Sequence, residues 1–254
     1  MILKTEGLSK HFGGVKAVQN VDMEIRKGEV LGIIGPNGAG KTTLFNVISG
    51  FNKPTKGKVY FDGVETTGNP VHEMSRNGLT RTFQNIRLFG QMTVIDNLVV
   101  GQHTKIDTNI FGIVVKSSGT KKKENDAYIK ANEILEYLGI DHLENELVNN
   151  LPYGLQRKVE IGRALASDPK LIFLDEPCAG MNPNETHDLM KLVAGIRDRG
   201  PTIAVIEHNM QMVMGISDRI IVLDFGEKIA EGSPQEVQGN QKVIEAYLGV
   251  EEEE

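Results

Sequence analysis

The segment Gly35 to Thr42 constrains the fold more strongly than any other part of the sequence. It reads Gly-Pro-Asn-Gly-Ala-Gly-Lys-Thr and fits the pattern G-x-x-x-x-G-K-[ST]. The apolar run Val30 to Ile34 precedes it, and Thr42 to Ile48 follows with helical spacing. This order of strand, glycine loop and helix is the context that the pattern requires.

The chemistry of this loop is that of a phosphate site. Its glycines allow successive backbone N–H groups to turn toward one anion, and the helix start adds its partial positive charge. Lys41 can reach the β- and γ-phosphates, and the Thr42 hydroxyl can ligate Mg²⁺. A chance match is expected in on the order of 1% of chains of this length. We therefore predict that Gly35 to Thr42 binds a nucleotide.

Two adjacent carboxylates end another apolar strand. Leu171 to Leu174 leads directly into Asp175 and Glu176. Successive residues leaving a strand point in different directions, so Asp175 can hold Mg²⁺ through water while Glu176 faces an attacking water as general base. Such a strand end is as often structural as functional when it occurs alone. Together with the phosphate loop, it predicts a metal site and a base.

His208 follows a third apolar strand, Thr202 to Ile206. A lone histidine is more often structural, but this position lies on the ligand-bearing edge of the sheet, where the imidazole can hydrogen-bond the γ-phosphate. Gln84 would by itself be read as a surface glutamine.

The remaining pattern predicts an α/β fold with three parts. Compact apolar strands separated by helices, among them Ile220 to Leu223, predict a mostly parallel sheet covered on both faces. Leu3 to Phe12 and Val15 to Ile25 partly alternate apolar and polar residues and predict an antiparallel hairpin, to which Lys58 to Phe61 adds a strand. A long charged stretch with an amphipathic piece at Asn125 to Leu138 predicts a helical insertion.

These parts give one domain over residues 1–254. Residues 1–85 and 160–250 form the predicted nucleotide-binding core with its N-terminal antiparallel β subdomain. Residues from about 86 to 159 form the inserted α-helical subdomain, and 251–254 is an acidic tail.

Composition narrows the class of protein. The net charge is −6, and Glu251 to Glu254 supplies four of the negative charges, so the body is nearly neutral and nucleic acid is not an expected partner. Cys178 is the only cysteine, which excludes an internal disulfide and a cysteine-based zinc site. Apolar runs such as Ile110 to Val115 are shorter than the roughly 20 residues that a transmembrane helix needs. Because the N-terminus also lacks the apolar stretch of a secretory signal, we expect a cytoplasmic protein.

The motifs in this order resemble the ATP-binding cassette family over nearly the whole chain. Leu151 to Gln156 stands where that family has its signature motif LSGGQ, followed by a predicted helix Arg157 to Ala166. Ala179 to Asn182 occupies the D-loop position. The resemblance implies a P-loop NTPase in which two subunits close head to tail, and each signature motif completes the other subunit's ATP site.

The resemblance also implies roles for single residues. An aromatic residue near the N-terminus stacks on adenine in this family, which implies that role for Phe12; the alternative is packing within the hairpin. Gln84 matches the glutamine that senses Mg²⁺ and the attacking water, and His208 matches the switch histidine. The implied catalytic residues are Glu176, His208 and Gln84, and the implied Mg²⁺ ligands are Thr42, Gln84 and Asp175. The implied ATP-binding residues are Phe12, Val18, Gly35, Pro36, Asn37, Gly38, Ala39, Gly40, Lys41, Thr42 and Thr43.

Longer stretches look like the larger ATPase subunit of branched-chain amino-acid importers. These are Thr80 to Phe89, Met214 to Arg219 and the ending Ala246 to Gly249. The resemblance implies Mg²⁺-dependent ATP hydrolysis at the cytoplasmic face of the cell membrane. The implied partners are transmembrane permease subunits, a second ATPase subunit and, indirectly, a solute-binding protein.

Other readings remain open at this point. Urea importers and lipopolysaccharide exporters have very similar ATPases. A soluble cassette acting on nucleic acid or ribosomes would be expected to have tandem cassettes, a long coiled-coil insertion or a strongly basic face, and the sequence has none of these. A nucleotide-binding regulator without hydrolysis is disfavoured by Glu176 and His208.

The signature motif departs from the family pattern. Pro152 replaces the serine that donates a hydroxyl to the partner's γ-phosphate, and Leu155 replaces a glutamine. Proline suits the first turn of a helix, and Gly154 still allows close backbone approach. We therefore expect a complete ATP site in this subunit and a weakened contribution to the partner's site.

Restoring the family residue tests this expectation. The substitution Pro152→Ser should raise the rate of ATP hydrolysis, because it supplies the missing hydroxyl. A phosphate-release assay on the wild type and the variant measures the effect, and an unchanged or lower rate would count against the idea.

Overall fold

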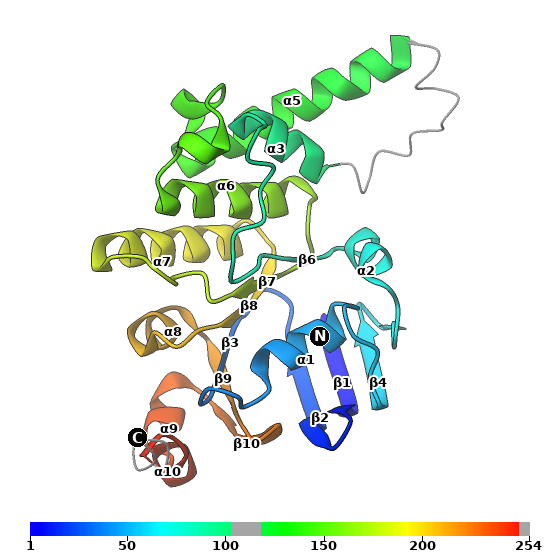
Figure 1. The fold of residues 1–254 in the computed structure, drawn as a ribbon, viewed down its shortest axis with the longest axis vertical. Helices are drawn as coiled ribbons and strands as arrows, with labels where there is room; N and C mark the ends of the chain where they lie inside the picture. Colours follow the sequence, from blue (N-terminus) through cyan, green and yellow to red (C-terminus); the bar gives the residue numbers. More distant parts are fainter. Residues whose placement is uncertain (103–117, 249–254) are drawn as a thin grey trace. The chain divides into compact units, whose positions relative to one another are not determined.

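The computed structural model describes residues 1–102 and 118–248, and contacts divide the chain into two compact units (Figure 1). The first unit is Met1–Arg81 with Lys170–Glu254, and the second is Thr82–Pro169. The second unit therefore contains the whole predicted helix at 157–166, which the sequence-based boundary at residue 159 divided. The predicted acidic tail and the apolar run 110–115 lie outside the described residues.

A six-stranded sheet forms the centre of the first unit. Its strand order is β10-β9-β3-β8-β7-β6, and only the β9–β10 pair is antiparallel. The strands are β3 (Val30–Ile34), β6 (Leu79–Arg81), β7 (Leu171–Asp175), β8 (Thr202–Ile206), β9 (Arg219–Asp224) and β10 (Glu227–Gly232). The predicted mostly parallel sheet is confirmed, and β3, β7 and β8 end at the same edge because they are parallel neighbours.

A second, antiparallel sheet of four strands belongs to the same unit. Its order is β2-β1-β4-β5, with Leu3 of β1 paired to Ile25 of β2 on one side and to Phe61 of β4 on the other. The strands are β1 (Leu3–Phe12), β2 (Val15–Ile25), β4 (Lys56–Phe61) and β5 (Val64–Glu65). The predicted N-terminal hairpin and the added strand are confirmed.

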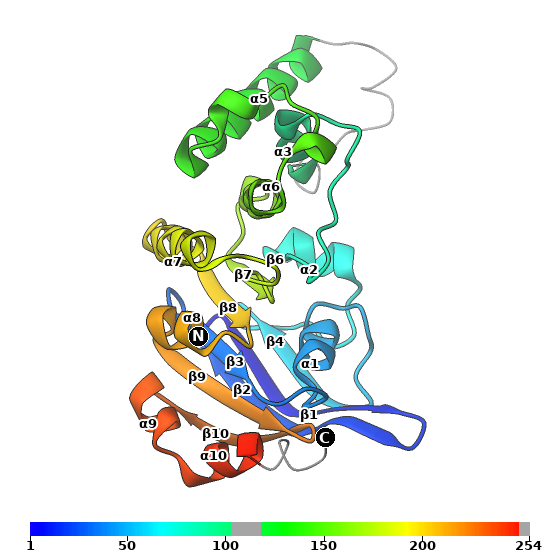
Figure 2. The same cartoon turned by 60° about the vertical axis from the view of Figure 1, so that its left-hand side comes forward.

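Alternating residues of the central strands face two separate apolar cores. Ile33 packs in one core with α1 (Lys41–Ile48) and the antiparallel sheet, whereas Ile34 packs in the other. This second core contains residues of α8 (Met210–Ile216), α9 (Pro234–Gln238) and α10 (Gln241–Leu248). Figures 1 and 2 show α1 on one side of β3 and β9 and α8 on the other. Two-sided burial explains why these strands read as continuous apolar runs.

Two further helices complete the first unit. They are α2 (Val71–Asn77) and α7 (Pro183–Asp198). Asn182 caps α7: its side chain accepts hydrogen bonds from the backbone N–H groups of Asn184 and Glu185, at 2.9 and 3.1 Å. The Glu185 carboxylate accepts in return from the N–H of Asn182, at 2.9 Å.

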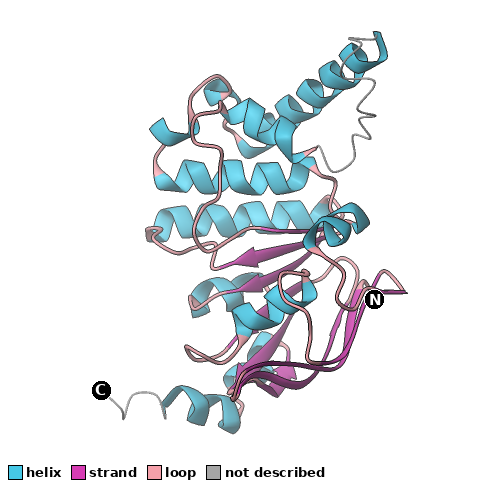
Figure 3. Cartoon of the chain, turned by 45° about the vertical axis from the view of Figure 1, so that its right-hand side comes forward, coloured by secondary structure: helices cyan, strands magenta, loops and turns pink. Residues whose placement is uncertain are grey.

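The second unit is drawn as helix and loop in its described part (Figure 3). Its helices are α3 (Val94–Gly101), α5 (Ser118–Leu138) and α6 (Tyr153–Ala166), with single turns η1 (Asp141–Leu143) and η2 (Val148–Asn150). Gly162 allows close packing of α6, because a Cβ there would lie 2.7 Å from Leu138 and 3.4 Å from Leu98. Within residues 1–102 and 118–248, no helix is both long and apolar enough to span a bilayer.

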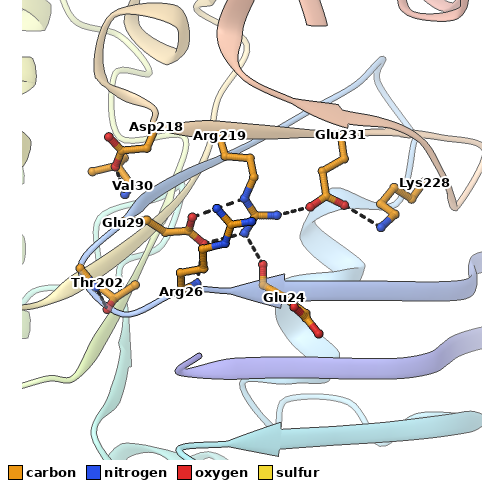
Figure 4. A network of polar contacts seen from close by, with 10 residues as sticks. Glu24, Arg26, Glu29, Val30, Thr202, Asp218, Arg219, Lys228 and Glu231 are labelled. Carbon is orange, nitrogen blue, oxygen red and sulfur yellow. Dashed lines mark hydrogen bonds and ion pairs between the residues drawn. The ribbon is translucent and has the colours of Figure 1, made fainter. Parts of the chain in front are cut away.

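A buried ion-pair network at Arg219 connects the two sheets of the first unit (Figure 4). The Arg219 guanidinium donates to both carboxylate oxygens of Glu29, at 2.7 and 3.3 Å, and to the carbonyl oxygen of Glu24 in β2, at 2.6 Å. It also pairs with Glu231 of β10, whose second oxygen accepts from Lys228 at 2.7 Å. Burial alone would lower the pKa of Arg219, but Glu29 and Glu231 outweigh that effect and raise it.

Removing this guanidinium should destabilise the first unit. Arg219→Met leaves the Glu29 carboxylate, 8% exposed, without its charged partner, which costs about 3–5 kcal/mol for a buried pair. Urea unfolding measures the loss, with the exposed Arg76→Met as a matched control expected to change stability by less than about 0.5 kcal/mol. Equal effects of the two substitutions would contradict this role.

Candidate functional site

The loop between β3 and α1 holds a backbone shape that needs glycine. Gly35, Gly38 and Gly40 have φ values of 149°, 79° and 95°. A Cβ on Gly35 would lie 2.0 Å from the carbonyl oxygen of Leu223, and one on Gly40 would lie 2.2 Å from that of Ala17. Neighbouring backbone therefore presses on the loop from β9 and from β2, and side chains at these two positions are excluded.

The start of α1 has the features of an anion site. Gly40 is the N-cap residue of α1. In the described part of the chain, no side chain hydrogen-bonds the N–H groups of the first turn as a cap, and the first turn contains no acidic residue. The N–H groups of a first helical turn lack partners within the helix, and their dipoles favour a negative charge. A phosphate group can therefore bind there.

Lys41 is folded back onto the loop. Its ammonium group donates to the carbonyl oxygens of Gly35 and Pro36, at 2.7 and 2.8 Å, and the residue is 5% exposed. Burial lowers the pKa of Lys41, and the charges of Glu176 and Asp175 oppose that shift. Contact with a phosphate therefore requires the ammonium to exchange carbonyl partners for phosphate oxygens.

Glu176 and His208 lie together at the carboxyl ends of β7 and β8. The Glu176 Oε1 and His208 Nε2 atoms are 3.0 Å apart, and the Glu176 N–H donates to the carbonyl oxygen of Ile206 at 2.9 Å. Glu176 has a φ of 45°, a left-handed conformation that costs a non-glycine residue about 1–3 kcal/mol. The parallel pairing of β7 with β8 thus brings two of the predicted catalytic residues into contact.

Asp175 is held by an arginine that sequence reasoning missed. An ion pair of 2.5 Å joins it to Arg81 at the end of β6, and the two side chains are 3% and 5% exposed. Arg81 also donates to the side-chain oxygen of Asn46 in α1, at 2.6 Å. The strand order, with β6 beside β7, brings Arg81 to this edge; no local pattern predicts it.

Glu207 is a second residue that sequence reasoning missed. Its buried carboxylate accepts hydrogen bonds from the backbone N–H groups of Cys178, His208 and Asn209, at 2.6, 3.0 and 3.2 Å. It therefore fixes the segments that follow Glu176 and β8. Its position immediately before the predicted His208 was the signal in the sequence that could have identified it.

The predicted adenine-site residues differ in exposure. Phe12 ends β1 with 47% of its surface exposed, and the Lys10 ammonium lies 4.8 Å from its ring centroid. Phe12 is thus accessible to a ligand, although the Lys10 ammonium lies over its ring. Val18 is fully buried in the core, so it can support such a site only from within the protein.

Gln84 belongs to the second unit, where α6 fixes its backbone. Arg157 donates to the carbonyl oxygens of Phe83 and Gln84, at 2.7 and 2.9 Å, and pairs with Glu160 at 2.7 Å. Glu160 accepts in turn from the N–H groups of Phe83 and Arg87, at 3.4 and 3.3 Å. Burial raises the pKa of Glu160, and the Arg157 charge opposes this. We call this fully buried pair the Arg157–Glu160 clamp.

The signature segment begins α6 earlier than predicted. The helix starts at Tyr153 and not at Arg157, so Gly154 and Leu155 lie in its first turn. Pro152 is the N-cap residue, and its carbonyl oxygen accepts from the N–H groups of Leu155 and Gln156, both at 3.0 Å. A proline carbonyl can start a helix as well as any other, which is why the departure from the serine pattern leaves the helix intact.

This combination of a glycine-rich phosphate loop, a carboxylate–histidine contact at the sheet edge and a helical unit defines a P-loop ATPase of the cassette type. Residues 18–179 match the sequence model of the family described as ABC transporter, and residues 227–253 match one described as branched-chain amino acid ATP-binding cassette transporter. The chain belongs to the ABC transporter family. Within such transporters it is an ATP-binding and ATP-hydrolysing subunit.

Curated relatives match over nearly the full length. The chain is 45% identical to the high-affinity branched-chain amino acid transport ATP-binding protein LivG of Salmonella typhimurium, over 98% of each chain. It is 43% identical to the corresponding protein BraF of Pseudomonas aeruginosa, again over 98% of each.

Solved structures agree with the fold. An ATP-binding cassette of an ABC transporter in its ADP conformation is 37% identical, covers 98% of each chain and has a TM-score of 0.85. A dimeric cassette in a post-hydrolysis state, bound to ADP and Pi, is 27% identical and has a TM-score of 0.77 over 92% of this chain and 99% of that one. The fold class predicted from the sequence is confirmed.

Proposed function

We propose that this chain hydrolyses Mg²⁺-ATP at the cytoplasmic face of the cell membrane to drive uptake of branched-chain amino acids. One observation carries the solute class: the similarity to branched-chain amino acid transport proteins extends over 98% of the chain, including its C-terminal segment 227–253. Phosphate-loop chemistry is common to all cassettes, so the loop alone would not distinguish solutes.

The first unit supplies the groups for hydrolysis in this proposal. Glu176 activates the water in line with the γ-phosphate, and its contact with His208 orients the carboxylate. Lys41 and the first turn of α1 bind the phosphates. Phe12 stacks on adenine, and Gln84 has the role that the family resemblance gives to the glutamine at its position.

The oxygen donors at this edge suit Mg²⁺. Thr42 is an exposed residue, and the Asp175 carboxylate is fixed in place by Arg81. Among the described residues, no group of three or more His, Cys, Asp or Glu side chains could hold a metal ion by itself. This fits Mg²⁺, which is bound through one or two protein oxygens plus substrate phosphates and water. The ion would neutralise charge that develops on the phosphate oxygens.

The proposed partners follow from the family architecture. A second cassette subunit would close head to tail on this one, and permease subunits would contact the pair, with a solute-binding protein acting through the permease. Support comes from the dimeric related cassette and from relatives that are ATP-binding components of transporters.

Replacing the proposed base separates catalysis from binding. Glu176→Gln should lower phosphate release at least about a hundredfold while ATP still binds, because the amide keeps the shape of the side chain but cannot accept the proton. The control is Glu227→Gln, an exposed glutamate at the start of β10. Wild-type hydrolysis by Glu176→Gln would remove Glu176 as the base.

Purification of the tagged chain from native membranes tests the transport role. We expect a multi-spanning permease pair and a second cassette subunit to co-purify, with ATP hydrolysis stimulated by leucine-loaded binding protein. Stimulation by a urea-loaded protein instead would reassign the solute. Recovery of ribosomes, DNA or no membrane partner would overturn the transport proposal and leave the ATPase assignment intact.

A further inference from the structure

Arg81 is a buried cation at the edge of the sheet where the predicted catalytic residues lie. Its guanidinium donates to the Oδ2 atom of Asp175 at 2.5 Å, and the two side chains are 5% and 3% exposed. A charge is tolerated inside a protein where a partner of opposite charge offsets the cost of removing it from water. Arg81 is therefore the counter-charge of Asp175.

The other contacts of Arg81 hold the guanidinium against the helix that follows the phosphate loop. It donates to the side-chain oxygen of Asn46 in α1, at 2.6 Å. Its central carbon lies 5.7 Å from the ring centroid of Phe45, and this ring stacks on Phe173 of β7 with 3.9 Å between the centroids. Cation–π and charge-assisted hydrogen bonds together fix the guanidinium beside Asp175.

The ion pair lies within electrostatic reach of the phosphate loop. Asp175 pairs with Ile206 between β7 and β8, and Ile206 pairs with Ile33 between β8 and β3. Ile33 lies shortly before Gly35. Neighbouring strands are about 4.8 Å apart, so two spacings place Asp175 about 10 Å from the strand that leads into the loop. A charge buried at this distance acts on an anion in the loop with little screening by salt.

We propose that Arg81 is a positioning residue that neutralises Asp175 and so allows the phosphate loop to bind a nucleotide before a metal ion does. Without the guanidinium, Asp175 would add an uncompensated negative charge beside Glu176, close to an anionic ligand. A divalent cation would then have to supply the missing charge, and nucleotide binding would depend on it. The inference rests on the proposed binding of phosphate by the loop and is independent of the transported solute.

The full chain with Arg81→Gln tests this role, because glutamine removes the charge but keeps hydrogen-bonding groups. The Kd for ADP is measured by titration calorimetry in EDTA and again in saturating Mg²⁺. We expect the Kd in EDTA to rise about tenfold, the effect of one charge about 10 Å away at an effective dielectric constant near 20. The Kd in Mg²⁺ should change by less than about threefold, because the cation compensates Asp175.

Two further variants separate charge from structure. Asp175→Asn alone leaves the Arg81 charge uncompensated and should lower the Kd for ADP in EDTA about tenfold, a gain that structural damage would not produce. Arg81→Gln combined with Asp175→Asn removes both charges and should return that Kd to within about threefold of the wild-type value. If Arg81 had a merely structural role, the double variant would stay as weak as Arg81→Gln, in EDTA and in Mg²⁺ alike, and the inference would be overturned.

The matched control is Arg76→Gln in α2, which removes the same charge from an exposed position. It should leave the Kd for ADP unchanged in both conditions. An unchanged Kd in EDTA for Arg81→Gln, or an equal rise for Arg76→Gln, would also overturn the inference. Failure of the loop assignment itself would be distinct, because the wild type would then bind no ADP even in Mg²⁺.

Discussion

The backbone shape of the phosphate loop is the constraint on which the rest of the first unit depends. At Gly35 and Gly40 the loop is pressed against carbonyl oxygens of β9 and β2, so its geometry is set by both sheets together. The Arg219 network fixes those same strands to each other through a buried charge pair. Backbone N–H groups that bind an anion cannot change rotamer as a side chain can. Their positions relative to the anion are therefore set by the rigid structure around the loop.

The carboxyl edge of the sheet combines groups that are distant in sequence. Glu176 meets His208 because β7 pairs with β8, and Asp175 meets Arg81 because β7 also pairs with β6. The strained backbone of Glu176 is held by its hydrogen bond to Ile206. Unfavourable conformations persist where surrounding structure over-determines them, and such positions cluster at active sites.

Local patterns predicted the fold and the motif residues but not their neighbours across the sheet. Strands β3 and β8 and the β1–β2 hairpin were predicted with their observed bounds, because two-sided burial and alternation leave strong signals. Arg81 was missed because β6 has three residues and its pairing is long-range. The start of α6 was predicted too late in the chain because its N-cap residue is Pro152, and proline is not among the residues that usually cap a helix with a side chain.

The Arg157–Glu160 clamp has a consequence for exchanging parts between cassettes. Both charges of the clamp lie in α6, and the segment with Gln84 contributes only backbone carbonyl and N–H groups, among them those of Phe83 and Gln84, that hydrogen-bond them. A chimaera that takes only the loop from a relative therefore keeps these contacts, whereas one that takes a helix without the pair leaves the loop's backbone groups without their partners. The helix thus holds the segment with Gln84 whichever side chains that segment carries, although some seventy residues of chain separate the two.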